Sequence, residues 1–169
     1  MRIFVIAACI LIFSSCKKTG STCNMDEVYR INGTKGNIIQ GITGTVSFKE
    51  GNCMPSFSFS TSCKNCPVKR TMRIYEYTLA KQATPTNNTE GRFYDSFSTR
   101  LIKEVESDDN GFFQASLPAG KYTLVAIENG KLYSDTGEII SGEMGISPVT
   151  VNSAQYTISN FVIGYKAYY

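Results

Sequence analysis

The sequence predicts an all-β protein built as a single β-sandwich, and three observations lead to this prediction. After residue 40, most apolar runs are short and alternate with polar residues, as in strands with one buried and one solvated face. Residues with turn chemistry separate these runs. Helical spacing of apolar residues over a useful length does not occur after the first fifteen residues. About seven short strands spaced in this way favour a sandwich over a barrel of long strands.

The apolar runs give the expected strands. In the first, 42–48, Ile42, Val46 and Phe48 take one face and threonine or serine the other. The remaining strands are expected at 71–79, 97–105, 113–117, 122–126, 148–151 and 155–169.

Short polar segments between these strands are expected to be turns. They read Asp-Asp-Asn-Gly at 108–111, Pro-Ala-Gly at 118–120 and Glu-Asn-Gly at 128–130. Asn and Gly tolerate the positive φ of tight turns, where a residue with a Cβ loses about 1 kcal/mol or more. We therefore expect Gly111 and Gly120 to resist substitution.

Three motifs resemble those of the carboxypeptidase regulatory-like domain. They are Gly41-Ile-Thr-Gly-Thr-Val46, Ser107-Asp-Asp-Asn-Gly-Phe-Phe113 and Leu117-Pro-Ala-Gly-Lys-Tyr-Thr-Leu124. The resemblance covers 41–169, and segments 51–55 and 68–75 are similar to small lipoproteins of this class in Bacteroidetes. It implies a seven-stranded, transthyretin-like (prealbumin-like) Greek-key sandwich. It implies no activity, because this domain does no chemistry in the enzymes that give the family its name.

The start of the chain has the pattern of a bacterial lipoprotein signal peptide. Arg2 precedes an apolar run at 3–13, which matches a signal-peptide core and is shorter than the roughly 20 residues that span a bilayer. Ser14 and Ser15 then precede Cys16, and Phe-Ser-Ser-Cys resembles a lipobox. A short buried helix, or an ordinary secretory signal followed by a chance cysteine, is the alternative. We expect Cys16 to carry the lipid, with palmitate among its acyl chains.

Acylation of Cys16 predicts a membrane-anchored protein outside the cytoplasm, because several acyl chains anchor firmly where one chain anchors weakly. Lys17 and Lys18 follow with no acidic residue at the second position, which resembles outer-membrane lipoproteins. The expected location is the cell envelope at the outer membrane, with the protein facing either the periplasm or the surface. The expected domain plan is a signal peptide at 1–15, a lipidated flexible tether at 16–40 and the sandwich at 41–169.

The composition excludes several classes of function. The 169 residues contain no histidine, which removes Ser-His-Asp and Cys-His nucleophile systems and the commonest imidazole metal ligand. The formal charge of +3 is too small to predict a nucleic-acid partner. We therefore expect a non-enzymatic protein with no catalytic residues, no metal, no cofactor and no nucleic acid.

Four cysteines remain after the signal and the lipid site: Cys23, Cys53, Cys63 and Cys66. An even number in an oxidising compartment favours structural disulfides. The two-residue spacing of Cys63 and Cys66 also occurs in redox and zinc sites, but a helix after the first cysteine and a second close pair are missing.

The pairing of these cysteines stays open between two arrangements. A bridge from Cys53 to Cys63 or Cys66 closes a loop rich in serine and phenylalanine, and it is favoured because it removes more entropy from the unfolded chain. The other arrangement joins Cys63 to Cys66 and leaves Cys23 to Cys53. Unpaired thiols are a further alternative.

Several tyrosines fall on the polar-side phase of the expected strands or near the end of the sequence: Tyr75, Tyr77, Tyr94, Tyr165, Tyr168 and Tyr169. An exposed aromatic strip can stack on sugars or contact a protein. We single out Tyr75, Tyr77 and Tyr165 as candidate contact residues. The alternative is that these rings fill the core of the sandwich.

The sequence favours a membrane-anchored binding or assembly module of the envelope. Its expected partners are the membrane, through the N-terminal lipid anchor, and an envelope protein or a glycan. Two alternatives remain: a thiol-disulfide redox protein that uses Cys63 and Cys66, and a glycan-binding accessory lipoprotein.

Overall fold

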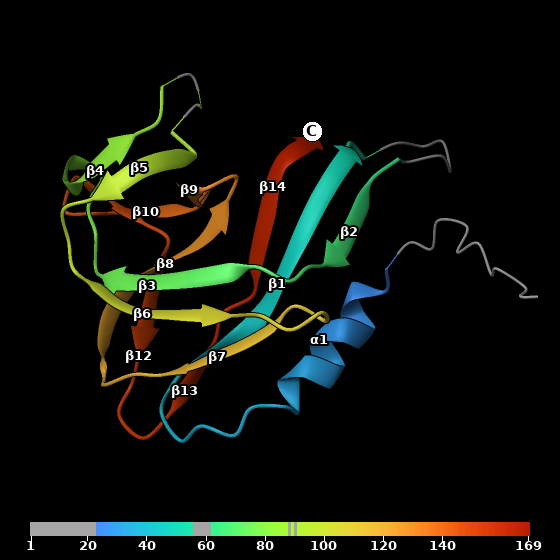
Figure 1. Cartoon of the computed structure of the whole chain (residues 1–169), viewed down its shortest axis with the longest axis horizontal. Helices are drawn as coiled ribbons and strands as arrows, with labels where there is room; N and C mark the ends of the chain where they lie inside the picture. The colour runs from blue at the N-terminus through green and yellow to red at the C-terminus, as the bar shows by residue number, and fades with distance from the viewer. Residues whose placement is uncertain (1–22, 56–61, 88, 90) are drawn as a thin grey trace, which may run out of the picture.

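The computed structural model describes residues 23–55, 62–87, 89 and 91–169, and it shows two β-sheets packed face to face (Figure 1). One helix, α1 (Met25–Gly33), and one 3-10 turn, η1 (Ala80–Gln82), occur in this part of the chain. Across the described ranges, no helix is long and apolar enough to cross a membrane. The predicted all-β sandwich is confirmed, whereas the expected signal peptide at 1–15 and lipid site Cys16 lie outside the described residues.

The first sheet is organised around one long central strand. Its five strands are β1 (Gly41–Asn52), β2 (Lys64–Pro67), β7 (Phe112–Ser116), β13 (Tyr156–Ile158) and β14 (Phe161–Tyr168). Along one side, β1 pairs in parallel with β13 and then β14, in the same register as far as Phe48, and the register shifts between Phe48 and Glu50. Along the other side it pairs antiparallel with β7 and then β2. The strand expected at 155–169 is therefore two shorter strands, β13 and β14, which follow each other along the same side of β1.

The second sheet has seven strands, and a small hairpin adjoins it. Its main order is β4 (Ala83–Pro85), β5 (Phe93–Phe97), β9 (Lys131–Tyr133), β8 (Gly120–Glu128), β3 (Thr71–Glu76) and β6 (Leu101–Glu106), with β12 (Pro148–Val151) paired to β8. The hairpin consists of β10 (Gly137–Ile140) and β11 (Glu143–Ile146). The strand expected at 97–105 spans the end of β5 and most of β6. Strands β2, β4, β9, β10 and β11 were not predicted, because each has at most four residues and shows no clear alternation.

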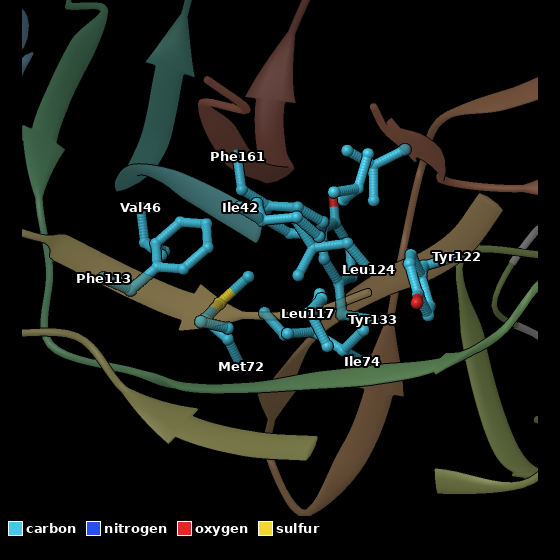
Figure 2. Close-up of a cluster of buried hydrophobic side chains, with 14 of the residues drawn as sticks. Ile42, Val46, Met72, Ile74, Phe113, Leu117, Tyr122, Leu124, Tyr133 and Phe161 are labelled. Carbon is cyan, nitrogen blue, oxygen red and sulfur yellow. The ribbon is translucent and has the colours of Figure 1, made fainter. Parts of the chain in front are cut away.

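The main hydrophobic core lies between the two sheets (Figure 2). Both sheets contribute fully buried side chains to it: Ile42, Val46, Met72, Ile74, Phe113, Leu124, Tyr133 and Ile163. Burying each large apolar side chain contributes about 1.5–3 kcal/mol. The predicted alternation therefore identified the core-facing side of β1, where Ile42 and Val46 are fully buried.

A second, smaller cluster covers the opposite face of the seven-stranded sheet. It contains Tyr75, Val125, Leu132 and Ile146. Neighbouring residues of a strand point to opposite faces, so Tyr75 and Val125 lie opposite Ile74 and Leu124. The expectation of a solvated second face for 71–79 is therefore wrong at Tyr75, which is 8% exposed.

Helix α1 lies within the segment 16–40 that was expected to be a flexible tether. The side chain of Asn24 caps the helix by accepting a hydrogen bond from the Glu27 N–H at 3.2 Å. Arg30 pairs with Glu27 one turn earlier. The helix has nine residues and few apolar ones, so its sequence shows little periodicity.

Tertiary contacts hold α1 against β1 and β2, since an isolated helix of this length is marginal in water. The buried Asn32 amide donates to Thr45 Oγ1 at 3.0 Å and to the Asn110 carbonyl at 2.8 Å. A disulfide joins Cys23, just before the helix, to Cys66 in β2. Residues 23–33 are therefore part of the folded unit, which corrects the expected tether.

The predicted turn at 108–111 is present, but it connects the two sheets and does not close a hairpin. It follows β6 in one sheet and leads into β7 in the other. Asp108 Oδ1 accepts hydrogen bonds from the N–H groups of Asn110 and Phe112, and Gly111 has φ of 74°. Gly120 lacks a left-handed φ, so the expected requirement for glycine at that turn is wrong.

The predicted turn at 128–130 is a tight hairpin between β8 and β9. Asn129 has φ of 52° and Gly130 has φ of 74°, and Glu128 pairs with Lys131 around them. Two central residues with positive φ are typical of a type I′ turn. Ser141 and Gly142 close the β10–β11 hairpin in the same way.

Replacing Gly111 by alanine should destabilise the protein, whereas replacing Gly120 should not. A Cβ at Gly111 would be strained by the left-handed φ, which costs about 1 kcal/mol, and would also overlap the Val46 carbonyl oxygen. A Cβ at Gly120 would meet its nearest neighbour, Tyr122 Oη, at 3.4 Å. Urea unfolding should show a loss above about 1 kcal/mol for Gly111→Ala and under about 0.5 kcal/mol for Gly120→Ala. Equal stability of the two variants would contradict this assignment.

Candidate functional site

The four candidate cysteines form two disulfides. Cys53 bonds to Cys63, which closes the serine- and phenylalanine-rich connection, and Cys23 bonds to Cys66. The loop-closing arrangement is therefore confirmed, and the Cys63–Cys66 pairing is not formed. Since these two cysteines bond to different partners, the structure contradicts a redox dithiol at this position.

The three candidate tyrosines do not form one exposed strip. Tyr75 packs edge-on against Phe97 in the second cluster, with ring centroids 5.1 Å apart. Tyr77 is partly buried, and its hydroxyl donates to Glu138 Oε1 at 3.1 Å. Tyr165 packs at the edge of the main core, and its hydroxyl donates to Glu128 Oε1 at 3.0 Å.

Two adjoining hollows are found instead at one end of the sandwich, and together we call them the groove. They share Arg92, Asp135 and Thr136, which we call the wall. The larger hollow has a volume of about 450 Å³ and is further lined by Lys49, Asn65, Val162, Gly164, Ala167 and Tyr169. The smaller has a volume of about 270 Å³ and is further lined by residues of β10, β11 and their surroundings, including Tyr94, Ser134 and Met144.

The floor of the larger hollow comes from β1, β2 and β14. Lys49 pairs with Asn65 across β1 and β2, and Ser47 pairs with Val162 across β1 and β14. Because side chains alternate along a strand, these residues lie opposite the core-facing Val46 and Ile163. The floor also contains small residues of β14, which let a ligand approach the backbone closely.

The wall is positioned by a hydrogen bond between the two sheets. Tyr133 in β9 is fully buried, and its hydroxyl accepts from the Gly164 N–H in β14 at 2.9 Å. The same hydroxyl donates to Asp135 Oδ2 at 2.7 Å. Burial, together with the hydrogen bond to Asp135, raises the pKa of Tyr133, so the hydroxyl stays protonated and keeps its role as a donor.

The residues that follow Asp135 are held by further hydrogen bonds. Thr136 Oγ1 donates to Ser147 Oγ at 3.1 Å, and the Ser147 N–H donates to the Thr136 carbonyl at 2.9 Å. The Ser134 N–H donates to the Arg92 carbonyl at 3.0 Å. The backbone of the wall is thus held by hydrogen bonds, as is expected of a preformed binding site.

The groove presents polar groups and aromatic rings to a ligand. Lys49 and Arg92 are positive, and Asp135 is negative. Lys49 Nζ lies 4.8 Å from the ring centroid of Tyr169, within the range of a cation–π contact. The described residues contain no group of three or more His, Cys, Asp or Glu side chains that is able to hold a metal ion. This arrangement provides hydrogen bonds and ring contacts for binding.

Sequence reasoning did not find the groove. Tyr94 and Tyr169 are among the tyrosines noted on the polar side of strands or near the end of the sequence, but no feature of the sequence marked them as ligand contacts. Lys49, Arg92 and Asp135 belong to separate stretches of sequence. The pairing of β1 with β14, and the hydrogen bond from the Gly164 N–H to Tyr133 between the two sheets, bring them together.

Comparison with known proteins gives little further information. No protein-family model matches the chain, and no curated protein is significantly similar to it. One crystal structure that aligns with it is that of a Pseudomonas aeruginosa protein described as a "putative carbohydrate binding protein". The two chains are 14% identical, the alignment covers 79% of this chain and 95% of that one, and the TM-score is 0.39. This likeness is too low to carry an argument about fold or ligand.

Replacing both cysteines of either disulfide by serine should destabilise the domain, and the loss should be larger for Cys23–Cys66 than for Cys53–Cys63. The bridged cysteines are 43 residues apart in Cys23–Cys66 and 10 apart in Cys53–Cys63. The chain-entropy relation then gives losses of about 4 and about 3 kcal/mol, respectively. Urea unfolding of the two double variants measures these losses, and non-reducing peptide mapping of the wild type checks the pairing. A Cys63–Cys66 peptide would contradict the assignment.

Proposed function

We propose that the protein is a non-enzymatic, lipid-anchored lipoprotein of the cell envelope, at the outer membrane, whose sandwich binds a saccharide in the groove. The observation that carries the proposal is the groove itself, with its fixed wall, small floor and two tyrosine rings. Its larger hollow falls in the range of about 300–1,000 Å³ that is usual for small-molecule sites.

The chemistry of the groove favours a ligand rich in hydroxyl groups. Saccharides present hydroxyls that both donate and accept hydrogen bonds, and C–H faces that pack on aromatic rings. Asp135 supplies acceptors, Arg92 supplies donors and Asn65 supplies both, while Tyr94 and Tyr169 supply rings. A purely apolar ligand could form no hydrogen bond with any of these polar groups.

The proposed location rests on the lipobox and is supported by the two disulfides. Disulfides persist in oxidising compartments and are rare in the cytosol. Cys23 is bonded to Cys66, and six residues separate Cys23 from Cys16 in the sequence. A chain of that length reaches at most about 25 Å, so the proposal places the sandwich close to the membrane surface.

The finer fold assignment belongs to the same proposal. We assign the sandwich to the Greek-key type of the carboxypeptidase regulatory-like family, with seven main strands and additional short ones, because its three motifs fall at structurally important positions. They provide the start of the central strand β1, the turn between the sheets at Gly111 and the entry into β8.

Replacing Cys16 by serine should release the protein from membranes, since the thiol is the proposed site of acylation. Cys9→Ser is the matched control, because Cys9 lies within the proposed signal peptide. Membrane fractionation and incorporation of labelled palmitate, after expression of the full chain in a Gram-negative host, measure the effect. If Cys16→Ser remains lipidated and in the envelope fraction, the proposed anchor is wrong.

Filling the groove should abolish saccharide binding. Ala167→Trp places a large ring on the floor, and Lys166→Trp is a matched control at a neighbouring residue that does not line the groove. The full chain in detergent is screened against neutral and acidic oligosaccharides on an array, and hits are measured by calorimetry. We expect Ala167→Trp to weaken binding at least tenfold and Lys166→Trp to leave it unchanged. A wild-type protein that binds no saccharide would refute the proposed function.

A further inference from the structure

We infer that the groove is specific for an acidic saccharide, whose negative group lies beside Lys49 and whose sugar ring contacts Tyr169. This inference rests on the proposed saccharide-binding function and names the ligand class of the same site. Lys49, Tyr169 and Asn65 line the same end of the larger hollow, so one sugar unit can reach all three.

Lys49 is the first element of the argument, because it is half-buried and has no carboxylate partner among the described residues. Most other lysine and arginine side chains of the described chain form ion pairs, namely Arg30, Lys35, Lys69, Arg70, Arg73, Lys81, Arg100, Lys121 and Lys131. Apart from its contact with the Tyr169 ring, the Lys49 ammonium group is therefore available to a ligand. An anionic group of the ligand could form a charge-assisted hydrogen bond with it.

The surrounding charges also favour an anion. The acid in the groove lining, Asp135, already accepts the hydrogen bond from Tyr133. Arg92 contributes a second positive side chain on the wall. Lys49 therefore supplies the positive charge that an acidic ligand would meet in the larger hollow.

Tyr169 and Asn65 explain why the anion should be part of a sugar. The cation–π contact with Lys49 holds the Tyr169 ring at the groove, and Tyr169 remains 71% exposed and available to a sugar ring. The side-chain oxygen of Asn65 accepts no hydrogen bond from the described residues. A hydroxyl donor on the ligand would satisfy it after a small shift of the amide, because this oxygen is covered in the free protein.

The test compares ligands that differ in charge alone. Trigalacturonate and its methyl ester have the same rings, and the ester removes the negative charges. A sulfated galactose oligosaccharide tests whether a sulfate ester replaces the carboxylate. We expect the full chain in detergent to bind at least one of the two acidic ligands tenfold or more tightly than the neutral ester. Raising the salt concentration should reduce this preference, because salt screens the charge interaction.

Three variants assign the effect to Lys49. Lys49→Gln should lower the affinity for the acidic ligand about tenfold and leave that for the ester unchanged, and Lys49→Arg should keep the preference. Lys166→Gln is the matched control, because Lys166 also lies near aromatic rings and forms no ion pair with the described residues, but it does not line the groove. Thermal unfolding confirms that each variant is folded.

The outcomes separate the two proposals. Equal binding of acid and ester, or equal losses in Lys49→Gln and Lys166→Gln, would overturn the acidic specificity and leave the saccharide function standing. Failure of all saccharides, neutral ones included, would overturn both.

Discussion

Each of the other four strands of the five-stranded sheet is hydrogen-bonded to β1, so the position of this strand determines where the rest of the sheet lies. Its core-facing residues Ile42 and Val46 are fully buried, and Thr45 on the other face is covered by α1. At Gly44 a Cβ would overlap the Ser159 carbonyl, so glycine permits the close approach of the chain between β13 and β14. The same register that packs the core places Lys49 beside Asn65, and both line the groove with Val162 of β14.

The two disulfides give the short spacing of Cys63 and Cys66 a structural meaning. Strand β2 has four residues and pairs only with β1 among the described strands, so its hydrogen bonds alone hold it weakly. Cys63 bonds to Cys53 beyond the end of β1, and Cys66 bonds to Cys23 before α1. Asn65 lies between these two covalent attachments. The spacing therefore fixes a groove residue against β1, and the Cys23–Cys66 bond also holds α1 on the sandwich.

The sequence predicted those features that depend on local alternation and turn chemistry. Ile42 and Val46 were assigned to one face of a strand because side chains alternate, and both are buried in the core; the turn at Gly111 followed from Asn-Gly chemistry. The sequence did not predict the features that depend on tertiary contacts. Helix α1 depends on a disulfide and on Asn32, and Tyr75 is buried because a second cluster covers its face. The groove depends on strand pairings between distant segments, which no local pattern reports.

Tyr133 connects the packing of the core to the geometry of the groove. Its ring is buried between the sheets, and its hydroxyl bonds to the backbone of β14 on one side and to Asp135 on the other (Figure 2 shows the ring within the core). The position of Asp135 in the wall therefore depends on the distance between the two sheets, and the core side chains set that distance. A change in core packing at this end would move Asp135 relative to the floor. The groove is in this sense a property of the sandwich as a whole, and its shape is set before any ligand arrives.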